Sequence, residues 1–156
     1  MGNEWTRLAV ITYVKDIAFH ERNLDSLIQR GEKRRAEMDG IKGVRYDRDG
    51  SPVGWSDPLA AALDDLAEIA DAIGAEVALW GDRIEEAHRI FETNEETLMV
   101  WEHWGERMRW ADVAHRHCYN RTYVLEVAKR GIEIIWYMMP EEYRRSPYPA
   151  IPWSVK

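Results

Sequence analysis

Residues 59–91 of this 156-residue chain read LAAALDDLAEIADAIGAEVALWGDRIEEAHRIF. Apolar side chains recur along this stretch at alternating intervals of four and three residues, which is the heptad pattern of helices that pack lengthwise on one another. The heptad seam consists of Leu59, Leu63, Leu66, Ala70, Ile73, Val77, Trp80, Ile84, Ala87 and Phe91. With Pro58 at the first helical position, the pattern predicts one helix about 50 Å long, at about 1.5 Å per residue.

An amphipathic stripe also runs through the first part of the chain. From Glu4 to about Glu37 there is no proline, and apolar residues recur at intervals of three, four or seven. This stripe predicts a second long helix. Its apolar members are Val10, Val14, Ile17, Leu24 and Ile28. Glu21 interrupts the stripe at a position where an apolar side chain is expected.

Turn-forming pairs separate the two predicted helices. Pairs such as Asp39-Gly40 and Asp49-Gly50 predict a loop over residues 39–57. Ser56-Asp57-Pro58 then provides capping side chains and a proline suited to the start of the next helix. We expect an antiparallel, coiled-coil-like hairpin over residues 1–92, with the heptad seam packed on residues 8–28. A parallel dimer through the same seam is the alternative, because heptads alone fix neither the partner nor the orientation.

The remainder of the chain predicts shorter helices. Thr93 or Asn94 can cap a helix that has two glutamates in its first turn, where carboxylates favour the positive helix end. We expect helices over approximately Glu95–Glu106, Trp110–His117 and Arg121–Met139, the last ended by Pro140. Residues 141–156, with Pro147, Pro149 and Pro152, predict an extended, proline-rich tail. The sequence thus predicts an all-α protein in three parts, residues 1–92, 93–140 and 141–156.

Residues 110–130 read WADVAHRHCYNRTYVLEVAKR and match the requirements of a helix-turn-helix. This motif needs a small residue where two helices cross, apolar residues between the helices, a tight turn and polar side chains on the outer face of the second helix. Ala114 is the small residue. Val113, Val124 and Val127 are spaced to close the core. The side-chain oxygen of Asn120 can cap the second helix. The residues predicted to face outward and contact DNA are Asn120, Arg121, Thr122, Leu125, Glu126, Lys129 and Arg130.

At these residues the sequence resembles the helix-turn-helix of bacterial sigma-factor region four. It is more closely similar to phage-encoded late-transcription regulators of the ArpU/RinA type, which also have an N-terminal helical hairpin. The resemblance extends to a glycine-containing loop from Gly50 to Gly54, a helix start at Ser56-Asp57-Pro58 and a tryptophan, Trp110, that opens the motif. It implies a phage or prophage transcription regulator that binds duplex DNA and contacts RNA polymerase.

Charge is unevenly distributed along the chain. Residues 1–96 carry 12 Lys and Arg against 21 Asp and Glu, a net charge of −9, whereas residues 97–156 carry 9 against 7, a net charge of +2. The sign changes where the predicted motif begins, which favours DNA contact by the C-terminal part alone. Cys118 is the only cysteine, which indicates a reducing compartment such as the cytoplasm. The apolar runs are too short to predict a membrane span.

Other residues are of types that bind metals or bases. Glu85 and His88 have the Glu-x-x-His spacing of carboxylate-bridged metal sites, but both lie off the predicted seam. A second set of metal-ligand types is His103, His115, His117 and Cys118, which we interpret as structural residues of the motif. A set of acidic side chains, interpreted as solvated helix surface rather than a magnesium site, is Asp64, Asp65, Glu68, Asp71, Asp82 and Glu85. An aromatic set, interpreted as the core of the motif, is Trp101, Trp104, Trp110, Trp136 and Tyr137.

The sequence therefore predicts a cytoplasmic, non-enzymatic DNA-binding regulator without a cofactor or bound metal, which forms homo-oligomers through its helical hairpin. Two alternatives stay open. The first is a helical adaptor that keeps the fold but has lost DNA binding. The second is a magnesium-dependent, all-α nucleotide pyrophosphohydrolase. Salt-dependent binding to duplex DNA separates the regulator from the adaptor. Magnesium-dependent nucleotide turnover separates the hydrolase from both.

Overall fold

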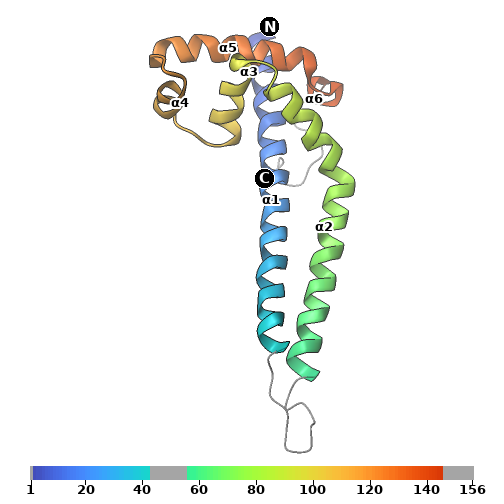
Figure 1. Cartoon of the computed structure of the whole chain (residues 1–156). Coiled ribbons are helices and arrows are strands. Elements are labelled where there is room, and N and C mark those ends of the chain that lie inside the picture. The colour runs from blue at the N-terminus through green and yellow to red at the C-terminus, as the bar shows by residue number, and fades with distance from the viewer. Residues whose placement is uncertain (1, 43–55, 146–156) are drawn as a thin grey trace, which may run out of the picture. The chain divides into compact units, whose positions relative to one another are not determined.

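A computed structural model describes residues 2–42 and 56–145, and every regular element within these ranges is a helix (Figure 1). This confirms the predicted all-α class. The elements are α1 (Gly2–Lys42), α2 (Ser56–Phe91), α3 (Glu95–Val100), the π-helix η1 (Trp101–Gly105), α4 (Trp110–His117), α5 (Arg121–Met138) and α6 (Glu141–Arg145). No helix in the described part of the chain is long and apolar enough to cross a membrane.

The helix boundaries follow the predicted ones closely in the C-terminal part and less closely in α1. α4 has the predicted ends, and α5 ends one residue before the predicted Met139. By contrast, α1 continues through Asp39-Gly40, which the turn signals placed in a loop. A single glycine near a helix end costs only about 1 kcal/mol, so it does not stop the helix. The rest of the predicted loop, residues 43–55, lies outside the described residues, as do the side chains of Ser56 and Asp57.

The predicted extended tail is wrong for its first five residues, which form α6. Pro140 ends α5, but proline also suits the start of a helix, and two glutamates occupy the first turn of α6 where carboxylates are favourable. Tyr143 of α6 is buried: its hydroxyl donates a hydrogen bond of 2.8 Å to Asp16, and its ring packs edge-on against Tyr13. Burial raises the pKa of Tyr143. Residues 146–156, which hold the prolines of the predicted tail, lie outside the described residues.

The chain divides into two compact units that differ from the predicted three parts. Within the described residues, unit 1 comprises 2–21 and 82–145, and unit 2 comprises 22–42 and 56–81. Both long helices contribute to both units. The buried side chains of unit 1 include Val10, Val14 and Ile17 from α1 and Ala87, Ile90 and Phe91 from α2. The ring of Phe91 stacks on Trp101 of η1, with ring centroids 4.9 Å apart, and also contacts Tyr13.

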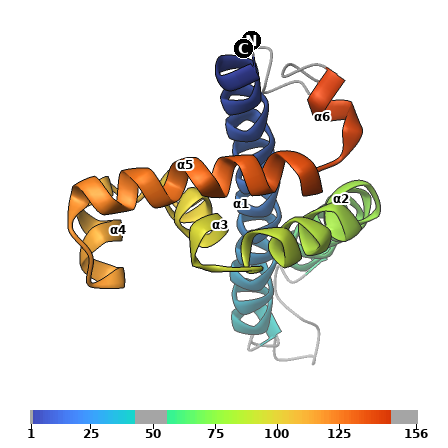
Figure 2. The same ribbon diagram turned by 90° about the horizontal axis from the view of Figure 1, so that it is seen from above.

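Helix α5 crosses α3 at close range inside unit 1. A side-chain carbon added at Gly131 would overlap the backbone carbonyl of Glu96, so only glycine allows this approach. The side chain of Asn94 caps α3 by accepting a hydrogen bond from the Thr97 amide, as predicted for this helix start. Figure 2 shows α4 at one end of α5, α3 beneath its middle and α6 beyond its other end.

In the described residues of unit 2, the segments 22–42 of α1 and 56–81 of α2 pack on each other through a narrow strip of side chains. Gly31 of α1 lies level with Ile69 of α2, and Arg34 pairs with Asp65 at 3.0 Å, so the segments run in opposite directions. Ile69 is buried in this strip, although it does not belong to the predicted seam. Two seam residues are about half exposed: Leu63 is 51% exposed and Val77 is 46% exposed. The seam is therefore covered by α1 only in part within unit 2.

Candidate nucleic-acid interface

Helices α4 and α5 are joined by a tight three-residue connection, Cys118 to Asn120. Cys118 adopts the left-handed conformation (φ 60°, ψ 37°), which turns the chain sharply at the end of α4. Backbone hydrogen bonds from Tyr119 to the Ala114 carbonyl and from Cys118 to the His115 carbonyl close the turn. Asn120 then caps α5, because its side-chain oxygen accepts a 2.8 Å hydrogen bond from the Tyr123 amide.

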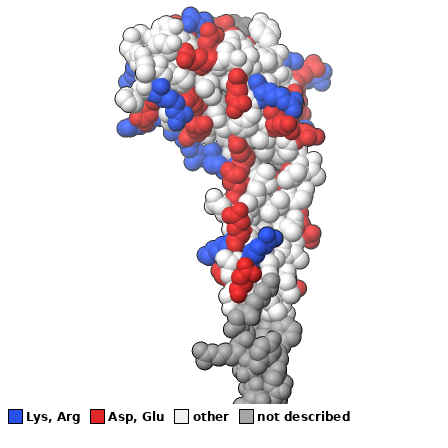
Figure 3. Space-filling model, in the orientation of Figure 1, with Lys and Arg blue, Asp and Glu red and all other residues white. Residues whose placement is uncertain are grey.

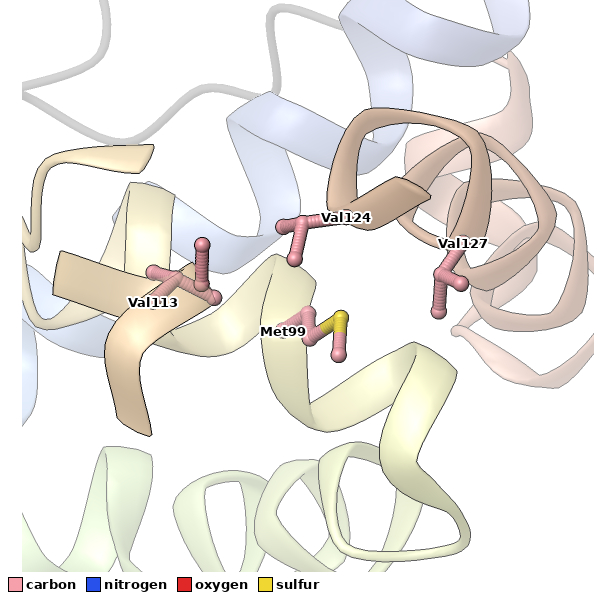
Figure 4. Packing of buried hydrophobic residues seen from close by; sticks show 5 residues of the cluster. Met99, Val113, Val124 and Val127 are labelled. Carbon is pink, nitrogen blue, oxygen red and sulfur yellow. The ribbon is translucent and has the colours of Figure 1, made fainter. Parts of the chain in front are cut away.

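A small apolar core holds these two helices against α3. Its members are Met99, Val113, Ala114, Val124 and Val127, all of which are buried. Figure 4 shows Met99 of α3 between the valines of α4 and α5. The sequence predicted the α4 and α5 members from their spacing, whereas it did not predict the contribution of Met99. Burial of these side chains fixes the angle between the two helices.

A buried carboxylate also ties α4 to η1. Glu102 is only 1% exposed, and its two oxygens lie 2.6 Å from Nη1 of Arg116 and 2.5 Å from Nε2 of His117. The other ring nitrogen of His117 lies 3.3 Å from Glu95. A buried carboxylate is costly unless its oxygens are paired, and both are paired here. Sequence reasoning assigned structural roles to His117 but did not find Glu102, which has no distinguishing pattern around it.

The first turn of α5 presents polar and aromatic side chains to solvent. Arg121 and Thr122, both predicted DNA contacts, are exposed. Arg121 forms no ion pair with any residue that the structure describes. Beside it, the exposed rings of Tyr119 and Tyr123 lie with their centroids 4.7 Å apart. A hydrogen bond to Glu95 raises the pKa of Tyr119. The two tyrosines were not among the predicted contacts, because apolar spacing does not distinguish exposed aromatic residues from core residues.

The later predicted contacts on α5 are exposed but paired with acidic neighbours. Nζ of Lys129 lies 3.4 Å from a carboxylate oxygen of Glu126. Nε of Arg130 lies 3.8 Å from a carboxylate oxygen of Glu96 on α3. These exposed pairs are weak, so a phosphate group can compete with them. They nevertheless reduce the positive potential along this part of α5.

Part of the predicted contact face of α5 lines a groove rather than an open surface. Leu125 is half-buried, and it lines a groove of about 200 Å³ together with Thr122, Glu126 and Lys129. The opposite side of the groove consists of Arg7 of α1 and two tryptophans, Trp104 and Trp110. The guanidinium of Arg7 lies 5.5 Å from the ring centre of Trp104. The face thus includes a sheltered part and an open part, which begins at Arg121.

The aromatic set that we assigned to the core lies partly at this groove. His103 stacks on Trp110 with ring centroids 3.8 Å apart, and Trp104 packs edge-on against the same ring. Burial lowers the pKa of His103, whose Nδ1 lies 2.7 Å from the Met108 carbonyl oxygen. Trp101 is buried, whereas Tyr137 is largely exposed. The core interpretation therefore fits Trp101 but not Tyr137.

The other candidate residues are distributed over the surface. Nε2 of His88 pairs with Glu21 at 2.8 Å, while Glu85 pairs with Arg89. Asp65 pairs with Arg34. His115 and Cys118 are exposed. Within residues 2–42 and 56–145, no group of three or more His, Cys, Asp and Glu side chains is arranged to hold a metal ion.

Comparison with known proteins gives no family for this chain. No protein-family model matches it. No characterised protein and no solved structure shows significant similarity to it either.

Proposed function

We propose that the α4–α5 unit is a helix-turn-helix that binds duplex DNA. The observation that carries this proposal is the combination of the left-handed turn at Cys118, the Asn120 cap and the shared core of α3, α4 and α5. A DNA-binding helix-turn-helix needs a second helix held rigidly with its N-terminal residues exposed, because these residues meet base edges in the major groove. Arg121 and Thr122 occupy that position on α5.

Electrostatics support contact at the beginning of α5 more than at its middle. Arg121 has no acidic partner among the described residues, and arginine can read guanine through two hydrogen bonds. Arg109 at the start of α4 is exposed and pairs with Asp112 on its own helix. The later cations of α5, Lys129 and Arg130, are partly neutralised by glutamates. We therefore assign base reading to the first turn of α5 and phosphate contact to the later cations.

The resemblance to phage late-transcription regulators suggests where such binding would act. Under this proposal the chain is a cytoplasmic, phage or prophage regulator that uses the α4–α5 unit on a promoter-proximal site. The paired long helices α1 and α2 form a helical hairpin that serves contacts with RNA polymerase or with another copy of the chain. No cofactor is required.

The test is fluorescence anisotropy of the full chain with a pool of random-sequence duplexes and with sequences selected from that pool. We expect the affinity to fall with salt, because neutralised phosphates release counterions. The slope should be shallow, because most cations of α4 and α5 are paired with acidic residues of the described part of the chain. Arg121→Ala should cost about 1–3 kcal/mol on selected sequences and reduce sequence preference. Arg130→Ala should weaken all sequences alike. Arg89→Ala removes an exposed arginine from α2 and is the matched control that should leave binding unchanged.

The pairing of Lys129 and Arg130 with glutamates favours one alternative, a helical adaptor that binds proteins and not DNA. Glu126→Arg discriminates between the two functions, because it removes a repulsive charge and frees Lys129. Stronger non-specific binding by this variant supports the DNA-binding function. If neither the wild-type chain nor Glu126→Arg binds duplex DNA at low salt, the adaptor function replaces it.

A further inference from the structure

One face of unit 2 leaves the heptad seam half covered. A groove of about 500 Å³ runs between α1 and α2 on this face. The α2 residues that line it are Leu66, Ala67, Ile69, Ala70 and Ile73. Leu63 and Val77 extend the same stripe in both directions, because each lies seven residues from Ala70 on the helix. On the side of the molecule drawn in Figure 3, few charged side chains of α2 are visible in unit 2, whereas charged side chains gather along α1.

The spacing of this stripe indicates what kind of partner covers it. Helix α2 packs on α1 through a separate line that includes Ala62, Asp65 and Ile69. The seam itself lies to one side of that line and keeps its heptad period from Leu63 to Val77, over about 21 Å. A stripe with this period accepts the side chains of another helix, knob into hole.

The sizes of the side chains along the stripe make it complementary to itself. An antiparallel copy of α2 centred on Ala70 would place residues opposite one another whose numbers sum to 140. Leu66 would then lie opposite Gly74, and Leu63 opposite Val77 of the second copy. Leu59 would lie opposite Gly81. At Leu66 and Leu59 a large residue thus lies opposite a glycine beside the stripe, while Ala70 meets Ala70 at the centre and Leu63 meets Val77. Small residues opposite large ones help to fill a helix interface without voids.

Two charged α1 residues, Asp25 and Arg35, are complementary in the same arrangement, whereas Glu32, which also lines the groove, would lie opposite Ile28 of the second copy. Because Gly31 is level with Ile69, residue 30 of α1 is level with Ala70. Asp25 and Arg35 lie five residues to either side of residue 30, so Asp25 of one copy would face Arg35 of the other. Neither side chain forms an ion pair with any residue in the described part of the chain. A parallel arrangement of the two copies would instead place the apolar stripe of each copy over the α1 charges of the other. Those charged side chains would then lose water without gaining a partner.

We propose that this face of unit 2 binds a second copy of the chain, with a two-fold axis at Ala70 and α2 antiparallel to α2. From Leu59 to Gly81 the face is about 33 Å long and, for two helices, about 20 Å wide, so the dimer buries about 1,300 Å² in total, within the range of specific interfaces. All neighbouring helices in the resulting four-helix bundle are antiparallel, which is favourable for their dipoles. The dimer does not depend on DNA binding, so either property can fail without the other.

The first test is sedimentation equilibrium of the full chain over a range of concentrations. We expect a reversible dimer. Ala70→Glu places two like charges at the axis and should give a monomer whose helical circular dichroism is unchanged. Ala75→Glu makes the same change at an exposed position on another side of α2, and should stay dimeric. A monomer at all concentrations, or a dimer that Ala70→Glu leaves intact, overturns the proposal.

Cross-linking tests the register. In a Cys118→Ser background, Ala70→Cys should oxidise to a covalent dimer, because residue 70 faces its own copy. Gly74→Cys is the control: its two copies would be separated by about 12 Å along the axis, beyond the reach of a disulfide. Efficient cross-linking through Gly74→Cys instead of Ala70→Cys rejects this register.

Charge reversal tests the α1 side. Asp25→Arg and Arg35→Asp should each weaken the dimer several-fold, since each places like charges opposite one another. The double variant restores opposite charges and should recover most of the wild-type dimerisation. Recovery supports the antiparallel register, and a double variant weaker than both single variants contradicts it.

Discussion

The two ends of α2 carry one heptad seam but bury it to different degrees. In unit 1, Ala87 and Phe91 are completely buried, whereas in unit 2 Leu63 and Val77 are about half exposed. The difference follows from the number of elements in each unit. In unit 1 a third element, η1, supplies Trp101, which stacks on Phe91. The described residues of unit 2 form two helical segments only. A heptad pattern therefore predicts that a stripe is buried, but not which element buries it.

The largest expected contrast comes from truncating one seam residue to alanine at each end of α2. Phe91→Ala should lower the free energy of unfolding by about 3–5 kcal/mol, because it leaves a cavity among aromatic rings. Leu63→Ala should lower it by less than about 1 kcal/mol, because half of that side chain is already in solvent. Urea denaturation at a concentration where the chain is monomeric measures both. Similar losses for the two variants would contradict the difference in burial.

A second test removes one hydrogen bond from unit 1. Tyr143→Phe deletes the hydroxyl that donates to Asp16 and keeps the ring that packs on Tyr13. We expect a loss of about 2 kcal/mol, because a buried hydrogen bond to an acidic side chain is stronger than most. Tyr137→Phe, at a largely exposed position, is the control and should be neutral. A neutral Tyr143→Phe would show that α6 is held by ring packing alone.

A third test concerns the connection between α4 and α5. Cys118 has a left-handed backbone conformation, which is unfavourable for residues with a Cβ atom and costs glycine nothing. Cys118→Gly should therefore raise the free energy of unfolding by up to about 1 kcal/mol. Thermal denaturation should show a higher midpoint for this variant and a lower one for Cys118→Val. Unchanged midpoints in both variants would mean that the turn carries no strain.

The smallest expected effect is the pH dependence of the His88–Glu21 pair in unit 1. The hydrogen bond to Glu21 raises the pKa of His88, and nearby Glu92 and Glu106 act in the same direction. A raised pKa in the folded state adds stability that is fully present below the unfolded-state pKa of about 6.5 and is lost as the pH rises through the folded pKa. Glu21→Gln should thus cost about 0.5 kcal/mol more at pH 5.5 than at pH 8.

The wild-type pH profile alone does not isolate this pair, because burial lowers the pKa of His103 and produces the opposite trend. For this reason the measured quantity is the difference between wild type and Glu21→Gln across pH. A difference that does not change with pH would show that Glu21 acts on His88 by packing rather than by charge.

Local signals in the sequence predicted much of the fold. The Asn120 cap, the ends of α4 and the start of α5 were predicted, and Asn94 is one of the two residues predicted to cap α3, because capping depends on residues within one turn. Side-chain pairs across the chain were not. Asp16 and Tyr143 are separated by 127 positions, and nothing near either residue indicates the other. Glu21 was recognised as an irregular member of its stripe, and its partner His88 explains why the irregularity is tolerated.

The candidate site was predicted to a similar extent. Spacing correctly predicted that Val113, Val124 and Val127 form a core, and six of the seven proposed contact residues are exposed. Spacing did not reveal that Glu96, on another helix, pairs with Arg130. It also did not show that Leu125 lines a groove, since the groove depends on residues of α1 and η1.

The π-helix η1 has a consequence for comparing this chain with others. A π-turn holds one residue more than the α-helical turn it replaces. Removing one residue from the segment Trp101–Gly105 would restore α-helical spacing and rotate the preceding side chains by about 100° relative to the following ones. Glu102 would then no longer meet Arg116 and His117. A sequence alignment with a chain that is α-helical throughout this segment therefore needs a one-residue gap within it. Without the gap, the alignment would match Glu102 to the wrong residue of the other chain.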